Sequence, residues 1–254
     1  MPHLKIQRPK VILFDLCGTV IKEFFIDRGL WPYIRDYIPT YLNENWNQPN
    51  VLLNLKYLRK AAAAEDSNAP QIPNNNDDKD TVIEATVAFV KYCIENKKES
   101  SGMTMLRFHM WFDAYRRQYI ETPVFSDVAV QIQKWRCDLN IKLHVLSNGW
   151  EEATKRFLSQ TTHGDLNLLI DGHHDTSLGP LTDPRTFLKV ARKLNEPPCN
   201  ILFLTKSSEE GQAAVRAGLN AVLCITHRAT IAKLDEKGKK MPRVRTFNQI
   251  EFVD

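Results

Sequence analysis

An aspartate at the end of an apolar run could carry phosphate chemistry in this chain. Residues 11 to 14 read Val-Ile-Leu-Phe, and Asp15 follows them directly, ahead of a turn at Gly18 and Thr19. Such a run is typical of a buried parallel strand, and ligands of α/β sheets collect beyond the carboxyl ends of the strands. A carboxylate placed there can act as a nucleophile, forming an aspartyl-phosphate that divides one difficult step into two easier ones.

Cys17 is unexpected beside such an aspartate. It lies two residues after Asp15 and therefore shares its face of the strand, where a phosphate site would need a second carboxylate. No histidine stands beside Cys17 in the sequence. We therefore interpret it as a small buried thiol rather than a catalytic one.

Three further apolar runs must help to position these residues. Each follows a helical pattern and ends in polar residues, so strands and helices alternate, which predicts a parallel sheet with right-handed crossovers. The runs and the polar residues after them are 141–146 with Ser147-Asn148-Gly149, 200–204 with Thr205-Lys206, and 220–225 with Thr226-His227, and the helices before them are 127–137, 184–194 and 208–217.

The stretch from residue 21 to residue 122 does not follow this alternation. It predicts helices over 26–43, 51–65, 81–96 and 102–119, and its segment 66–80, rich in Asn, Asp and Pro, predicts an exposed loop. The sequence thus indicates an α/β core formed by residues 1–20 and 123–254, with an all-helical cap inserted as residues 21–122.

Composition limits the classes of function. The chain has 254 residues, 43% of them hydrophobic, and a net charge of only +4, which indicates neither nucleic acid nor membrane as a partner. It has no apolar run long enough to span a membrane and no signal region, and its five scattered cysteines suit reduced thiols, so we expect a cytoplasmic protein, with the nucleus as a further location. The basic segment 233–245 is interpreted as solvated surface, with a patch for an acidic partner as the alternative.

The motifs together resemble the haloacid-dehalogenase-like phosphatases, and within them the acireductone synthase (enolase-phosphatase) family of methionine salvage. The resemblance covers nearly the whole chain, and its specific stretches are His109-Met110-Trp111, Lys134-Trp135-Arg136, residues 171–176 (Asp-Gly-His-His-Asp-Thr) and residues 201–205 (Ile-Leu-Phe-Leu-Thr). It implies a Rossmann-like core with a helical cap. It also implies enolisation and then dephosphorylation of 2,3-diketo-5-methylthiopentyl-1-phosphate with Mg²⁺.

Some site positions of the family are retained. The resemblance matches Asp15 to the nucleophile and Ser147-Asn148-Gly149 to the phosphate-binding turn, and it matches Glu210 to an acidic position of the family.

Three other positions are replaced. Cys17 stands where the family has an acidic metal ligand, Leu181 where it has a phosphate-binding lysine, and Lys206 where it has a second metal-binding aspartate. Mg²⁺ is a hard ion that binds oxygen ligands, whereas a thiol is soft and ordinarily protonated. An ammonium repels the ion, by roughly 4 kcal/mol per unit charge product at 4 Å. We therefore expect no metal, and we expect Lys206 to pair with Asp15 in its place.

These replacements predict a catalytically inactive or strongly impaired relative that binds a small phosphate or other anion, or a protein such as the active enzyme. The alternative is an active Mg²⁺-dependent phosphatase with a rearranged site, using Glu209 and Glu210 for metal and Lys189 for phosphate; Arg185 could also reach the phosphate position. His109, His173 and His174 are interpreted as packing residues rather than metal ligands.

Overall fold

The computed structural model describes residues 3–65, 67–74, 77–226 and 228–254, so His227 and positions 66, 75 and 76 of the predicted loop lie outside it. The chain divides into two compact units. The α/β unit comprises the chain up to Glu23 and from Glu121 to Asp254, and the helical unit comprises Phe24–Ile120.

The α/β unit is built on a parallel sheet of six strands. Its order is β4-β3-β2-β5-β6-β7, and every neighbouring pair is parallel. This confirms the predicted α/β class. The strands are β4 (Gly172–His174), β3 (Lys142–Leu146), β2 (Val11–Phe14), β5 (Ile201–Thr205), β6 (Asn220–Cys224) and β7 (Arg243–Val244).

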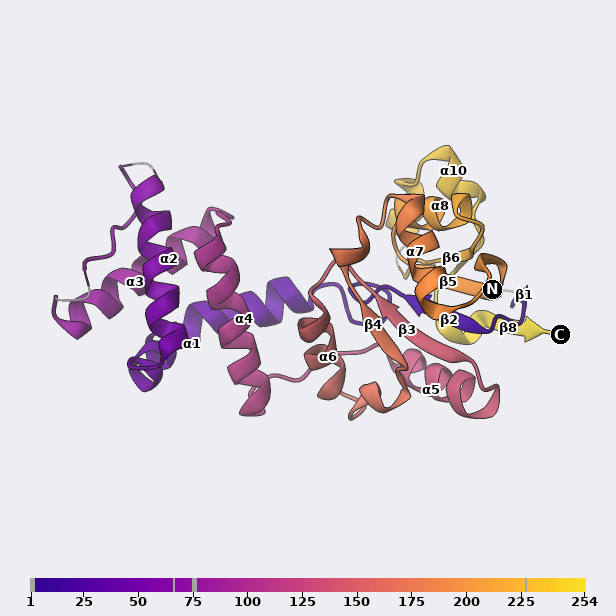
Figure 1. Ribbon diagram of the computed structural model, residues 1–254, viewed down its shortest axis with the longest axis horizontal. Helices are drawn as coiled ribbons and strands as arrows, with labels where there is room; N and C mark the ends of the chain where they lie inside the picture. Colours follow the sequence, from indigo (N-terminus) through magenta and orange to yellow (C-terminus); the bar gives the residue numbers. More distant parts are fainter. Residues whose placement is uncertain (1–2, 66, 75–76, 227) are drawn as a thin grey trace. The chain divides into compact units, whose positions relative to one another are not determined.

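Helices cover both sides of this sheet, with α7 and α8 on one side and α5 on the other (Figure 1). The predicted helices before β3, β5 and β6 are all present, and the first continues as a π-helical turn over Lys134–Asp138. The helices of the unit are α5 (Ser126–Gln133), α6 (Glu151–Ser159), α7 (Pro184–Leu194), α8 (Ser208–Arg216), α9 (Arg228–Ala232) and α10 (Glu236–Lys240).

The main apolar cluster of this unit holds α7 and α8 against the sheet. Leu13 and Phe203 of the central strands pack with Phe187 of α7 and Ala213 of α8, and all four side chains are buried. Asp183 and Ser207 begin the two helices as N-caps, accepting backbone N–H groups of the first turns. The loops at the carboxyl edge of the sheet are therefore held by well-packed elements.

The two chain ends form a small sheet of their own. β1 (Leu4–Gln7) and β8 (Ile250–Val253) pair in parallel and lie side by side in Figure 1. Neither strand was predicted from the sequence.

The helical unit contains the four predicted helices. Each is amphipathic or buried on one side, and Asp78 and Ser100 cap the third and fourth through their side-chain oxygens. The helices are α1 (Trp31–Asn45), preceded by a π-helical turn over Ile26–Leu30, α2 (Pro49–Ala64), α3 (Lys79–Glu95) and α4 (Ser101–Arg116).

The segment predicted as an exposed loop between α2 and α3 is partly buried. Residues 67–74 and 77–78 form no helix or strand, but Ala69 and Ile72 are buried. Gln71 donates to the Ala62 carbonyl at 2.9 Å, which ties the segment to α2. The expectation of exposure was wrong at these apolar positions because a polar composition hid two side chains that belong to the core.

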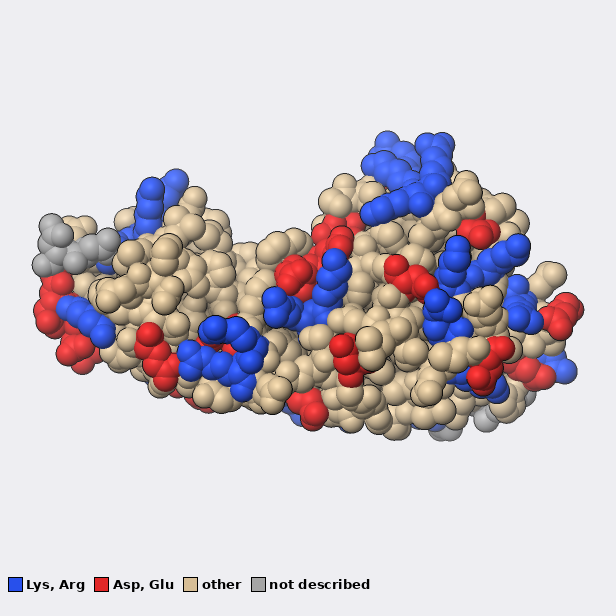
Figure 2. Space-filling model, turned by 60° about the horizontal axis from the view of Figure 1, so that its bottom comes forward, with Lys and Arg blue, Asp and Glu red and all other residues tan. Residues whose placement is uncertain are grey.

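Charges are mixed over the face of the molecule drawn in Figure 2. Figure 2 shows basic and acidic side chains interspersed on this face, with one gathering of basic side chains at its upper right. In the basic segment Lys237, Lys239 and Lys240 are exposed, and Lys239 forms an ion pair with Glu236 at 2.8 Å. No helix in the described part of the chain is long and apolar enough to cross a membrane.

Candidate active site

Asp15 lies at the carboxyl end of β2, in the middle of the sheet. Its backbone N–H donates to the Leu204 carbonyl at 3.0 Å, which extends the β2–β5 pairing by one residue. Its side chain is only 8% exposed, and it accepts hydrogen bonds from the Leu16 backbone and the Ser147 hydroxyl. The side chain is thus fixed at the sheet edge where the sequence predicted it.

Burial raises the pKa of Asp15 to about 7, and the nearby Glu210 carboxylate adds to the effect. The hydrogen bonds from Leu16 and Ser147 and the charge of Lys206 act in the opposite direction. Asp15 therefore keeps its proton to a higher pH than an ordinary aspartate, and the protonated form is a poor nucleophile.

The turn after β3 faces inward on this site. The Ser147 hydroxyl accepts from the Gly149 backbone N–H at 3.2 Å while donating to Asp15. The Asn148 side-chain amide donates to Glu210 Oε1 at 2.9 Å. The structure thus brings Ser147, Asn148 and Gly149 beside Asp15, with both side chains engaged by protein groups.

Glu210 is held from two sides. Its other oxygen accepts from the Thr205 hydroxyl at 2.8 Å, and the residue is buried in the first turn of α8. A buried carboxylate needs such donors to offset its lost hydration. Glu210 therefore joins the strand ends of β3 and β5 as a fixed acceptor.

Cys17 lies close to Asp15 and is half-buried. Burial and, to a smaller extent, the charges of Asp15 and Glu23 raise the pKa of its thiol to about 11, while the charge of Lys206 acts in the opposite direction. Cys17 is therefore a neutral thiol at physiological pH, without the thiolate that nucleophilic attack or metal binding requires.

Lys206 follows β5 and lies over the turn at Gly18. Gly18 has φ +83°, and an ideal Cβ built on it would be 2.5 Å from Lys206 Cδ and 3.2 Å from Nζ. The glycine therefore allows both the left-handed turn and the close approach of the lysine.

The ion pair of Lys206 is with Glu23. The expected partner, Asp15, feels the ammonium only through its charge, which lowers the pKa of Asp15. That expectation was wrong because Glu23 lies within reach. Glu23 was not predicted as a site residue because it falls in the stretch 21–122, which was predicted to belong to the cap. In the structure this residue belongs to the α/β unit, and the Ile21–Val124 bridge holds the neighbouring backbone there.

Leu181, at the predicted lysine position, belongs to the apolar core. It is 1% exposed and lies in the cluster that contains Leu146 and Phe187. The two basic residues that could replace the lysine are engaged elsewhere. Arg185 pairs with Asp183 at 2.6 Å, and Lys189 donates to the Leu178 carbonyl at 2.8 Å.

The histidines noted in the sequence make hydrogen bonds to protein groups. His109 Nδ1 is 3.1 Å from Asn54 Oδ1, and His173 contacts Thr154 and Asn167. His174 Nε2 is 3.3 Å from His144 Nδ1. Among the described residues, no group of three or more His, Cys, Asp or Glu side chains could hold a metal ion.

Comparison with curated sequences finds relatives over nearly the whole length of this chain. It is 32% identical over 247 residues to the enolase-phosphatase E1 of Xenopus tropicalis, covering 95% of this chain and 94% of the relative. It is 30% identical over 228 residues to that of Dictyostelium discoideum, covering 84% and 85%. A scan of protein-family models finds no match.

Solved structures share the fold. The UTR4 protein of Saccharomyces cerevisiae superposes with a TM-score of 0.74 at 19% identity, covering 96% of this chain and 100% of the yeast chain. A dehalogenase determined with an intermediate complex superposes with a TM-score of 0.54 at 15% identity, covering 96% of both chains.

Proposed function

Because this chain belongs to the enolase-phosphatase E1 family, we propose that it keeps the family's fold but acts as a binding protein with little or no Mg²⁺-dependent phosphatase activity. Its ligand would be a small phosphate or another anion, or a protein such as the active enzyme of the family.

The observation that carries this proposal is the position of Lys206. Its alkyl chain lies on the Gly18 turn and its ammonium pairs with Glu23. The charge of that ammonium also acts on Asp15 and Cys17. A cation is thus built into the part of the site that would have to attract Mg²⁺.

The other donors of the site also suit Mg²⁺ poorly. Mg²⁺ binds carboxylate and water oxygens in a near-ideal octahedron. Asp15 is partly protonated near pH 7, Cys17 is a neutral thiol, and both oxygens of Glu210 already accept hydrogen bonds. We therefore assign no reaction step to a metal ion.

The part of the site that would bind phosphate is also poorly suited to its ligand. An anion at the Ser147–Gly149 turn would have to take the Asn148 amide from Glu210. It would also approach the acidic side chains of Asp15 and Glu210 without the compensating lysine, because Leu181 is apolar and buried. Phosphoryl transfer depends on positioning and charge stabilisation, so this arrangement favours weak binding over turnover.

The active-enzyme alternative needs Glu209, Glu210 and Lys189 in new roles. Glu209 is exposed, Glu210 is held by Asn148 and Thr205, and Lys189 is exposed and bonded to the Leu178 carbonyl. These contacts favour an inactive binding protein over an active phosphatase.

A direct assay tests the proposal. Purified protein would be given the diketone phosphate or an aryl phosphate, with and without Mg²⁺, beside an active family member. We expect turnover reduced by a hundredfold or more, the scale on which single charge-stabilising groups act. Mg²⁺-dependent turnover at the rate of the active enzyme would overturn the proposal.

Restoring the metal ligands gives the complementary test. The double variant Cys17→Glu with Lys206→Asp replaces a thiol and a cation by two carboxylates, so it should show a saturable heat of Mg²⁺ binding that the parent lacks. Lys134→Asp, an exposed charge change outside the site, is the control and should remain without binding. Equal Mg²⁺ binding by parent and double variant would contradict the assignment.

A further inference from the structure

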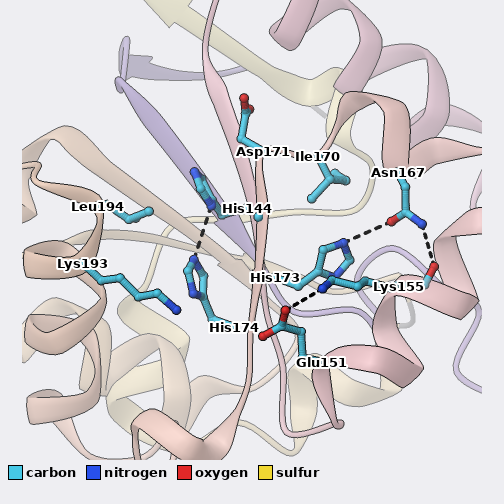
Figure 3. Close-up of a pocket in the computed structure, with 11 residues that line it drawn as sticks. His144, Glu151, Lys155, Asn167, Ile170, Asp171, His173, His174, Lys193 and Leu194 are labelled. Atoms are coloured by element: carbon cyan, nitrogen blue, oxygen red, sulfur yellow. Dashed lines mark hydrogen bonds and ion pairs between the residues drawn. The ribbon is translucent and has the colours of Figure 1, made fainter.

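A polar pocket lies along β4, the edge strand of the six-stranded sheet. It has a volume of about 620 Å³ and is lined by residues of β3, β4, α6 and α7. Figure 3 shows His144, His174 and Lys193 on one side of the β4 strand and His173 with Lys155 on the other. None of its lining residues belongs to the candidate active site. Volumes of this size suit small-molecule ligands.

The register of β3 and β4 builds one wall of this pocket. His144 pairs with Gly172, and an ideal Cβ on Gly172 would lie 2.8 Å from His144 Nδ1. The glycine thus admits the imidazole close to the strand. His174 lies two residues after Gly172 and on the same face of β4. Its ring stacks on that of His144, with 5.4 Å between the ring centroids.

The two rings leave one polar atom without a partner. His174 Nε2 and His144 Nδ1 are 3.3 Å apart, so one donates a proton and the other accepts it. In either tautomer His174 Nδ1 has no hydrogen-bond partner, although it is buried and the side chain is 5% exposed. Because such an atom destabilises a protein unless it is paired, it marks a place where a ligand atom would be favourable.

The acidic side chains in and beside the pocket already have partners. Glu151 pairs with Lys155 at 2.7 Å, Asp171 pairs with Arg136 at 3.0 Å, and Asp175 accepts backbone N–H groups of Glu151 and Ser177.

The Lys193 ammonium, in contrast, has no hydrogen bond or ion pair to any residue that the structure describes. It extends from α7 toward His174 (Figure 3). Burial, the neighbouring His144 and the charge of Lys193 together lower the pKa of His174 to about 4. The neutral imidazole and the unpaired cation together could hold an anion, whereas a metal cation would be repelled by Lys193.

We propose that this pocket binds the oxyanion group of a small ligand, a phosphate or a carboxylate, between Lys193 Nζ and His174 Nδ1. The ligand oxygen accepts from the ammonium, and the His174 ring, whose Nδ1 is buried in the free protein, turns to donate its Nδ1–H to the same oxygen. The site is independent of the proposed function. A backbone hydrogen bond links it to the candidate active site: the Ser147 N–H donates to the His174 carbonyl at 3.1 Å.

The NMR signals of the His174 imidazole report directly on binding at this site. The ¹³C and ¹⁵N resonances of His174 would be followed by NMR during titration with inorganic phosphate and, separately, with acetate. We expect saturable shifts with at least one anion; the stronger ligand identifies phosphate or carboxylate as the preferred chemistry. Bound anion should also raise the His174 titration midpoint by about one pH unit, as a nearby opposite charge does.

Lys193→Gln should lower the affinity for the anion about tenfold, which is the usual contribution of a charge-assisted hydrogen bond. Arg192→Gln removes a neighbouring exposed charge that does not line the pocket, so it should bind like the parent. Because Lys193 is exposed, its removal should leave the fold intact. Absence of His174 shifts with both anions, equal affinity in Lys193→Gln, or saturation by Zn²⁺ alone would each overturn the proposal.

Discussion

Asp15 combines a position suited to catalysis with a charge state that is not. It lies at the end of the central strand β2, where a nucleophile would be placed, but burial and Glu210 raise its pKa to about 7. Lys206, the cation whose charge acts on it, is paired with Glu23. In an active Mg²⁺ site the metal would stabilise the carboxylate. Here the burial of Asp15 is only partly compensated, which makes its ionisation a measurable cost to the fold.

The pH dependence of stability tests this interpretation. An ordinary aspartate titrates near pH 3.9, so between about pH 4 and pH 7 the folded state holds a proton that the unfolded state has released. Stability therefore falls as the pH rises through this window, and the full penalty remains above pH 7. Asp15→Asn should raise the free energy of unfolding by on the order of 1–3 kcal/mol at pH 8, and by less at pH 5.

Urea denaturation at the two pH values measures this difference. Asp138→Asn, an exposed aspartate in the same unit, is the control and should change stability by less than about 0.5 kcal/mol. A gain from Asp15→Asn that is the same at pH 5 and pH 8 would show that Asp15 is not the titrating group.

At the scale of elements, the sequence predicted the central strands and most helices because their patterns are local. The β2 run is continuously apolar, β3, β5 and β6 are mostly apolar, and α7 was predicted with its observed bounds. β1 and β8 were missed because each has only four residues, with exposed residues alternating with partly or fully buried ones, and because they pair with each other across almost the whole chain. β4 was missed because it has only three residues, Gly-His-His.

The candidate site was predictable to the same extent. Parallel strands bring their carboxyl ends together, so Asp15, Ser147 and Lys206 were expected at one edge. The individual partners were not predictable, because they depend on side-chain directions. Glu23 pairs with Lys206, Asn148 binds Glu210, and both contacts join residues far apart in the sequence.

Leu181 is the element-scale test of the missing phosphate lysine. It packs between α7 and the sheet and is 1% exposed. Leu181→Lys should lower the free energy of unfolding by about 3 kcal/mol or more, because it buries an unpaired ammonium. Leu181→Met keeps the volume and should cost less than about 1.5 kcal/mol.

Urea denaturation of both variants decides the matter. If Leu181→Lys proved as stable as Leu181→Met, the ammonium of the new lysine would have to reach solvent or a polar group outside the core. The position could then still serve phosphate binding, and the argument from burial would fail.

At the scale of the whole molecule, the α/β unit has the features of a domain that could fold alone. Its core cluster is drawn from its own strands and helices. The points where the chain leaves and re-enters it are neighbours within the unit. Lys22 N–H donates to the Pro123 carbonyl at 2.9 Å, and Phe125 N–H donates to the Val20 carbonyl at 3.1 Å. A short connection could therefore replace the helical unit without straining these bonds.

Replacing residues 24–120 by a short Gly-Ser linker should give a protein that unfolds in one cooperative urea transition. Trp135 is a natural probe, because it is buried and stacks on Phe247 at 5.3 Å between ring centroids. Its fluorescence and the far-UV circular dichroism should change together, as expected for two-state unfolding. If the fluorescence changed well before the dichroism, the packing of the α/β unit would depend on the helical unit. The inserted helices would then be part of its folding unit rather than an addition to it.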